Sequence, residues 1–188
     1  MSRTTEDIVK CFNQLRDFCR EVSTLLATAD TLVGDKGWIS ACGSRAVADR
    51  SDASYYPLKW IPAAFARLYV NNDRPNILAF VTVIVGGYEE KEKISEALVS
   101  GGWLEYAPGT VIGNDWYWWY TRWHSWIIDR QDNGKLYPRV VTKPKQAPGV
   151  LKVTTFAYPL DVITSGEVFK EIIVDRLLIE IDNVESPT

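Results

Sequence analysis

The segment from Asp115 to Ile127, DWYWWYTRWHSWI, gathers the side chains of this chain that are best suited to hold a ligand. It contains five of the eight tryptophans in the sequence, two tyrosines, an arginine and the single histidine. Indole and phenol rings can stack on a planar ring, and guanidinium groups bind phosphate or carboxylate. The segment is therefore the first candidate for a binding surface.

Positive charge is concentrated in and after this segment. Residues 116–152, which we call the basic block, carry seven basic and two acidic side chains, whereas the whole chain has a net charge of −3. The overall balance argues against a general nucleic-acid-binding protein. A local basic block can still attract one anionic ligand.

A predicted β-hairpin decides which of these side chains lie together. Asn133-Gly134 is the strongest hairpin-turn signal in the chain, and the aromatic residues before it favour a strand. A two-residue turn there pairs His124 with Lys143, and alternation along the strands then gathers basic and aromatic side chains on one face. This face is the predicted ligand-binding site, and its residues are Trp116, Trp118, Tyr120, Arg122, His124, Trp126, Arg139, Lys143 and Lys145.

Two alternatives to this hairpin site stay open. A helix capped by Asn114 places Trp116, Trp119 and Trp123 on one face, and this pattern competes with the strand. Alternatively, the strand forms but its aromatic face is covered by basic side chains or by another element of the fold.

A long amphipathic helix is predicted over residues 1–34. Thr4 or Thr5, followed by Glu6 and Asp7, suits a helix start, and Gly34 suits its end. A seven-residue spacing links Ile8, Leu15, Val22 and Ala29. This spacing admits a coiled-coil partner, although the simpler interpretation is a helix that lies along its own domain.

Residues 37–163 predict a sheet-rich body, and residues 165–180 predict a C-terminal helix capped by Ser165. Strands are expected before Val70, as a buried central strand within residues 76–87, and at residues 149–159. A short surface helix is predicted over residues 89–102, EEKEKISEALVSGG, because acids open this segment and glycines close it. The fold class is α+β: a single domain over residues 1–188, with a mainly antiparallel sheet, a long N-terminal helix and a shorter C-terminal helix.

Targeting and membrane signals are not found in the sequence. It has no apolar run of about 18 residues, and its N-terminus lacks a secretion signal. Cys11, Cys19 and Cys42 show no paired spacing, which predicts reduced thiols. We therefore expect a cytoplasmic protein without a membrane segment, a metal or a cofactor.

The sequence predicts a binding protein that holds an anionic, ring-containing ligand, such as a nucleotide or a short nucleic-acid segment. The first alternative is a protein-interaction subunit, whose N-terminal helix contacts another protein or a second copy of the chain. The second is a Mg²⁺-dependent nuclease-like enzyme with Asp73, Glu89 and Lys91 as its candidate residues. We predict no catalytic residue for the binding protein.

Overall fold

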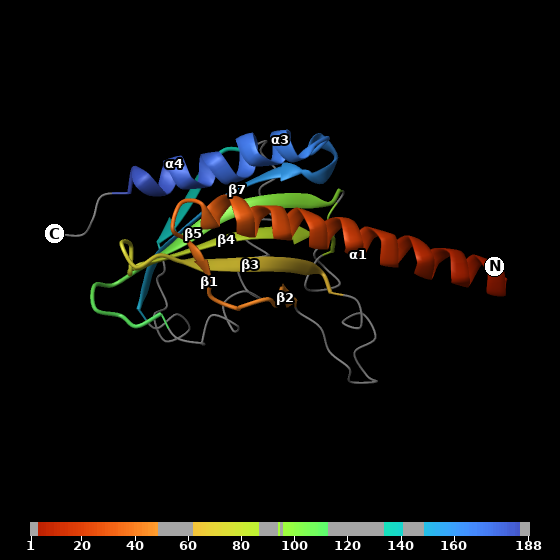
Figure 1. Cartoon of the computed structure of the whole chain (residues 1–188), viewed down its shortest axis with the longest axis horizontal. Coiled ribbons are helices and arrows are strands. Elements are labelled where there is room, and N and C mark those ends of the chain that lie inside the picture. The colour runs from red at the N-terminus through yellow and green to blue at the C-terminus, as the bar shows by residue number, and fades with distance from the viewer. Residues whose placement is uncertain are drawn as a thin grey trace.

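A computed structural model of the chain describes residues 4–48, 62–86, 94, 96–112, 134–140 and 149–184. The strands form one antiparallel sheet, and two helical segments cover one of its faces (Figure 1). The elements are α1 (Thr5–Gly34), β1 (Ile39–Ser40), β2 (Val47–Ala48), β3 (Ala64–Val70), β4 (Ile77–Ile84), β5 (Leu98–Tyr106), β6 (Tyr137–Val140), β7 (Val150–Pro159), η3 (Leu160–Val162), α3 (Gly166–Phe169), η4 (Lys170–Asp175) and α4 (Arg176–Asp182). The predicted α+β fold class is confirmed.

The N-terminal helix α1 begins at a capping box. The Thr4 hydroxyl accepts a hydrogen bond from the Asp7 N–H at 3.2 Å, and the Thr4 N–H donates to the Asp7 carboxylate at 3.0 Å. The Thr4 hydroxyl also donates to the Asp7 carboxylate at 2.8 Å, and the hydrogen bonds that the Thr4 hydroxyl and N–H donate to this carboxylate lower the pKa of Asp7. The helix extends to Gly34, so both predicted ends are confirmed.

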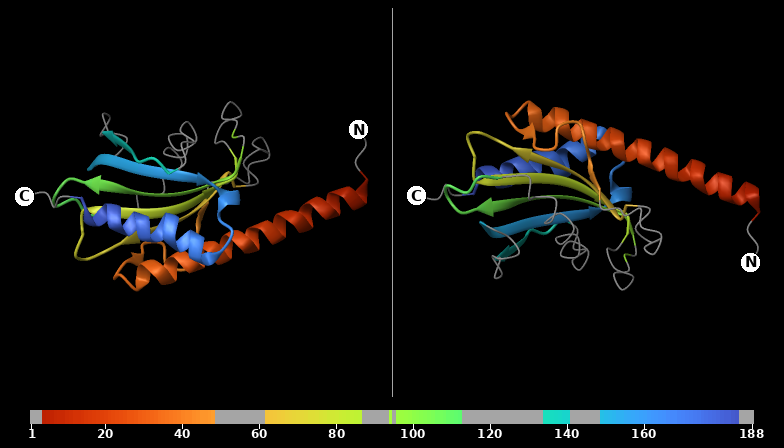
Figure 2. Two further views of the ribbon diagram at one scale, coloured as in Figure 1. Left: turned by 90° about the horizontal axis from the view of Figure 1, so that it is seen from above. Right: turned by 90° about the horizontal axis from the view of Figure 1, so that it is seen from below.

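The fully buried side chains of α1 lie in its C-terminal half. They are Val22, Leu26, Ala29 and Val33, and Phe18, one turn earlier, is partly buried against the same core. The two views of Figure 2 show the N-terminal half of this helix extending beyond the sheet.

The sheet has the strand order β1-β3-β4-β5-β7-β6, and β2 also pairs with β3. All residues of β4 are buried, which confirms the predicted central strand. One face of the sheet packs against α1 and the C-terminal helical segment through residues such as Tyr69, Val81 and Trp103. The other face carries a second buried cluster that includes Leu68, Phe80 and Leu104.

The predicted helix over residues 89–102 is wrong for its last five residues, because Leu98–Tyr106 is strand β5. Gly101 and Gly102 lie inside this strand. A Cβ atom at Gly101 would lie 2.6 Å from the Phe156 ring, and one at Gly102 would lie 2.5 Å from the Phe80 ring. These glycines leave room for one aromatic ring on each face of the sheet.

The C-terminal helical segment, residues 166–182, contains a wide turn. Ser165 caps it as predicted, by accepting a hydrogen bond from the Val168 N–H at 3.2 Å. The middle part, η4, is a π-helix, in which Lys170 forms an ion pair with Asp175. Two consecutive residues of η4, Ile173 and Val174, are both buried.

Arg74, in the turn between β3 and β4, anchors the end of this segment. Its Nη1 donates to the Val184 carbonyl at 3.0 Å, and its Nη2 lies 3.4 Å from the Asp182 carbonyl. Such contacts satisfy carbonyl groups that have no partner within a helix end. Among the helices that the structure describes, none has both the length and the apolar character needed to cross a membrane.

Candidate ligand-binding site

Most residues of the predicted basic-aromatic face lie outside the described residues. Trp116, Trp118, Tyr120, Arg122, His124 and Trp126 fall within residues 113–133, and Lys143 and Lys145 within residues 141–148. Arg139 is placed by its backbone, which belongs to β6 and pairs with Val153 of β7. The pairing across Asn133-Gly134 therefore stays a prediction, as does the choice between strand and helix for residues 115–127.

Gly134 is placed, and its conformation requires a glycine. Its φ is +80°, in the left-handed region, and its N–H donates to the Ala157 carbonyl at 2.7 Å. A Cβ atom there would lie 2.1 Å from the Tyr158 hydroxyl and 2.4 Å from Arg176 Nη1. The hydrogen bond from Gly134 to Ala157 holds the residues just before β6 beside β7.

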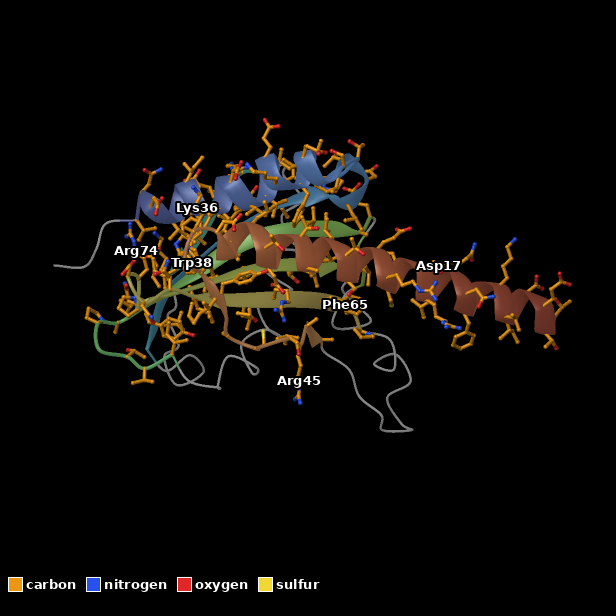
Figure 3. All side chains as sticks on the ribbon, in the orientation of Figure 1. Asp17, Lys36, Trp38, Arg45, Phe65 and Arg74 are labelled. Atoms are coloured by element: carbon orange, nitrogen blue, oxygen red, sulfur yellow. The ribbon has the colours of Figure 1, made fainter. Side chains whose placement is uncertain are left out.

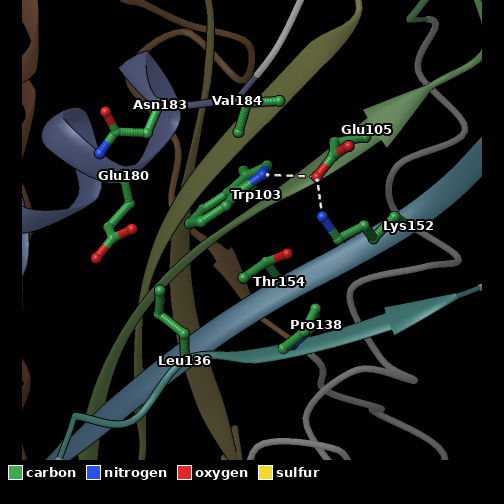
Figure 4. Close-up of a pocket in the computed structure, with 9 residues that line it drawn as sticks. All are labelled: Trp103, Glu105, Leu136, Pro138, Lys152, Thr154, Glu180, Asn183 and Val184. Atoms are coloured by element: carbon green, nitrogen blue, oxygen red, sulfur yellow. Dashed lines mark hydrogen bonds and ion pairs between the residues drawn. The ribbon is translucent and has the colours of Figure 1, made fainter.

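A pocket of about 460 Å³ lies between the helix-covered face of the sheet and the end of α4. The antiparallel register aligns Trp103, Thr154 and Pro138 across β5, β7 and β6, and it places Glu105 opposite Lys152. Figure 4 shows these side chains and the residues of α4 and its end around one space. The lining residues are Trp103, Glu105, Leu136, Pro138, Lys152, Thr154, Glu180, Asn183 and Val184.

Glu105 connects two of the polar groups in the pocket. Its Oε1 accepts a hydrogen bond from the indole Nε1 of Trp103 at 3.1 Å, and Lys152 Nζ lies 3.1 Å from the same oxygen. The indole is therefore held in one orientation, since Trp103 is only 3% exposed. The ammonium group of Lys152 has further donors, and its side chain is 38% exposed.

Thr154 places a polar atom without a partner in this pocket. The residue is 3% exposed, and its Oγ1 makes no hydrogen bond with any group in the described part of the chain. A hydroxyl can donate one hydrogen bond and accept two, and burying it without a partner costs about 1–3 kcal/mol. Because most buried polar atoms in proteins are hydrogen-bonded, this hydroxyl is an exception among the described residues.

The pocket can bind a ligand by hydrogen bonds and ring contact. Among the described residues that line it, the ionisable side chains are Glu105, Glu180 and Lys152, whose formal charges sum to −1. The Asn183 amide adds a donor and an acceptor, and Trp103 adds an aromatic wall. Within the described ranges, no cluster of three His, Cys, Asp or Glu side chains could hold a metal ion.

A second polar cluster lies under α1 and has a different character. Arg67, 5% exposed, donates from Nε and Nη2 to the two carboxylate oxygens of Asp30 at 2.8 and 2.6 Å. It also donates to the carbonyls of Gly43 and Arg45, and the Tyr69 hydroxyl donates to Asp30 at 2.9 Å. Burial, reinforced by Asp30, raises the pKa of Tyr69. Arg67 finds its partners inside the fold, so this cluster attaches α1 to the sheet rather than presenting groups to a ligand.

Asp73, a residue of the predicted nuclease site, lies in the turn before β4. In that turn its backbone N–H donates to the Asn71 side-chain oxygen at 2.8 Å. Glu89 and Lys91 are outside the described residues. The enzyme alternative therefore stays a prediction.

Five of the described lining residues are not among the site residues predicted from the sequence: Trp103, Glu105, Thr154, Glu180 and Asn183. Lys152 belongs to the prediction only as the last residue of the basic block. The spacing Trp103-x-Glu105 and Lys152-x-Thr154 puts each pair on one face of a strand. This spacing becomes informative only when the pairing of β5 with β7 is known.

Comparison of the chain with models of known protein families, with curated proteins and with solved structures finds no match.

Proposed function

We propose that the protein acts by binding a small molecule that contains a planar ring, and that the pocket between the sheet and α4 holds this ring. The buried Thr154 hydroxyl carries the proposal, because it lines the pocket and finds no partner among the described residues. A ligand group that donates to or accepts from this hydroxyl removes the cost of its burial.

The neighbouring side chains favour a ring that carries both donors and acceptors of hydrogen bonds. Glu180 offers an acceptor, Lys152 a donor and Asn183 one of each. The Trp103 indole, fixed by its hydrogen bond to Glu105, gives an aromatic contact. A nucleobase has this combination of a flat apolar surface and polar edges.

The basic block supports an anionic group on the same ligand. Leu136, Pro138 and Lys152 all line the pocket, and all three belong to residues 116–152. Because the described lining residues carry a negative formal charge in sum, we expect a phosphate group to lie outside the pocket rather than beside Glu105. A nucleotide, or a short nucleic-acid segment that inserts one base, fits this division.

Tryptophan fluorescence tests the proposal. The chain is titrated with a nucleoside, with its 5′-monophosphate and with a short oligonucleotide, each at low and at physiological salt. We expect all three to change the emission, because the ring binds near Trp103. The affinity of the protein should fall with rising salt only for the two probes that carry phosphate.

Two threonine variants complete this experiment. Thr154→Val removes the pocket hydroxyl and should weaken binding of the nucleoside about tenfold, the loss of one hydrogen bond. Thr155→Val is the matched control, because Thr155 is the next residue of β7 and faces the other side of the sheet. No change in emission with any probe, or equal weakening by both variants, would contradict the proposal.

A second candidate function, a protein-interaction subunit, is favoured by a different observation. Ile8, Val9 and Phe12 near the start of α1 are 46%, 54% and 62% exposed. Apolar side chains grouped on one helix surface are typical of a protein contact.

A further inference from the structure

The apolar surface of α1 continues past the point where the helix leaves the sheet. Side chains spaced alternately by four and three residues form what we call the α1 stripe: Ile8, Phe12, Leu15, Cys19, Val22, Leu26, Ala29 and Val33. From Val22 onward, every member of the stripe is buried. The earlier members are partly or largely exposed, and Figure 3 shows this half of the helix, with Asp17 on it, clear of the sheet.

We infer that a second copy of this chain covers the exposed half of the stripe, with the two α1 helices antiparallel. The inference rests on the second candidate function above and is independent of the ligand pocket. The proposed contact continues one that the fold already makes. The C-terminal half of the α1 stripe packs on the sheet, and the N-terminal half of the same stripe is exposed.

The shape of the molecule selects the antiparallel orientation. The stripe faces the chain's own sheet from Val22 to Val33. A parallel partner helix on the same stripe would bring its own sheet to the same end and collide with the first. An antiparallel partner places its sheet beyond the free N-terminal end, where Figures 1 and 2 show α1 projecting alone.

The length of the exposed half also fixes the register. In an antiparallel pair, Phe12 can pack against Leu15 of the second copy, and Ile8 against Cys19. Thr5, the first helical residue, then reaches the level of Val22, where the chain's own sheet begins to cover the stripe. If the second helix moved seven residues toward the N-terminal end of the first, Leu15 and Cys19 would stay uncovered. If it moved seven residues the other way, it would collide with the sheet that covers the first helix from Val22 onward.

The residues beside the stripe are compatible with this contact. Val9, 54% exposed, faces Arg16 of the second copy, whose methylene groups can cover it while the guanidinium stays in water. On the other flank, Cys11 faces Phe18 of the second copy, which is partly buried against the core of its own chain. The seam is thus bordered by apolar surface on both sides.

Sedimentation equilibrium over about 1–200 µM tests the association. Because the contact spans only about two heptads, we expect a reversible dimer with a dissociation constant on the order of tens of micromolar. Its mass should be twice the 21.3 kDa of one chain. Phe12→Glu should raise the dissociation constant at least about tenfold, since it places a charge in the seam. Asn13→Glu is the matched control: it adds the same charge one residue away, off the stripe, and should leave the dimer intact.

Crosslinking tests the orientation. In a chain with Cys11→Ser and Cys42→Ser, the added substitution Ile8→Cys should form disulfide-linked dimers with Cys19 of the second copy. When Cys19→Ser is also present, only a contact between the two introduced cysteines could crosslink, and we expect none. Crosslinking of this last variant would overturn the antiparallel register.

A chain that stays monomeric over the whole concentration range would overturn the second-copy inference. Binding of a hydrophobic dye then distinguishes a stripe that contacts a different protein from a stripe that contacts none. Dye binding that is lost in Phe12→Glu would leave the stripe as a surface for another protein, whereas dye binding unchanged in Phe12→Glu would remove the interaction surface as well. Neither result affects the nucleoside titration with Thr154→Val.

Discussion

The substitution Thr154→Val should stabilise the protein while it weakens ligand binding. The change replaces a buried hydroxyl, which has no partner in the described part of the fold, with a methyl group on a residue that is 3% exposed. Removing a buried, unsatisfied polar atom is worth about 1–3 kcal/mol. Both side chains are β-branched, so the loss of rotamer freedom is the same. We expect the free energy of unfolding to rise by about 1–3 kcal/mol, and Tm by about 2–4 °C for each kcal/mol.

Urea unfolding of the ligand-free protein measures this change, and Thr82→Val provides the comparison. Thr82 is fully buried in β4, and its hydroxyl donates to the Phe65 carbonyl at 3.1 Å. The same substitution there removes a hydrogen bond and should lower the free energy of unfolding by about 1 kcal/mol. Opposite signs for the two variants support the reasoning. A Thr154→Val protein that is less stable than the unmodified chain would refute it, because the hydroxyl would then have a partner within the fold.

Two other predictions concern the sheet and its attachment to α1. Gly101→Ala places a Cβ atom 2.6 Å from the buried ring of Phe156 and should lower the free energy of unfolding by about 1–3 kcal/mol. Gly166→Ala is the control, because a Cβ atom there meets nothing within 4 Å, and it should change the free energy of unfolding by no more than about 1 kcal/mol. Equal effects of the two substitutions in urea unfolding would show that the Phe156 ring does not need the space at Gly101. Burial and Asp30 raise the pKa of Tyr69 above its ordinary value of 10.0, so the unfolded chain releases this proton first as the pH increases. Stability should therefore fall as the pH rises through 10, by up to about 1.4 kcal/mol per pH unit, and Tyr69→Phe should reduce this slope in urea unfolding between pH 9 and 11. The same slope in both proteins would show that Tyr69 does not contribute.

Elements set by local chemistry could be predicted from the sequence. The capping residues of α1 and the apolar spacing behind them gave both ends of the helix, and Ser165 gave the start of the C-terminal one. The β-branched run of β4 identified a buried central strand. In each case the neighbouring residues contain the signal, because capping and amphipathic spacing act within a few turns.

Elements set by distant residues could not be predicted in the same way. The pair Gly101-Gly102 has the pattern of a helix end, yet it is part of β5, where the rings of Phe80 and Phe156 from two other strands occupy the space beside it. The pocket has the same origin. Trp103 and Thr154 meet only through the register of β5 on β7, and the sequence does not specify that register.

The wide turn in η4 sets the rotational phase of everything that follows it. An α-helix advances about 100° per residue, so a regular helix that buries Phe169 and Ile173 would next bury positions 176 and 180. In this chain Leu177 and Ile181 are buried instead, since the π turn absorbs one residue. Arg176 is thereby left beside Phe156, with its guanidinium carbon 4.6 Å from the ring centroid, and Glu180 stands at the pocket rather than in the core. The extra residue in η4 therefore gives the pocket its acidic wall.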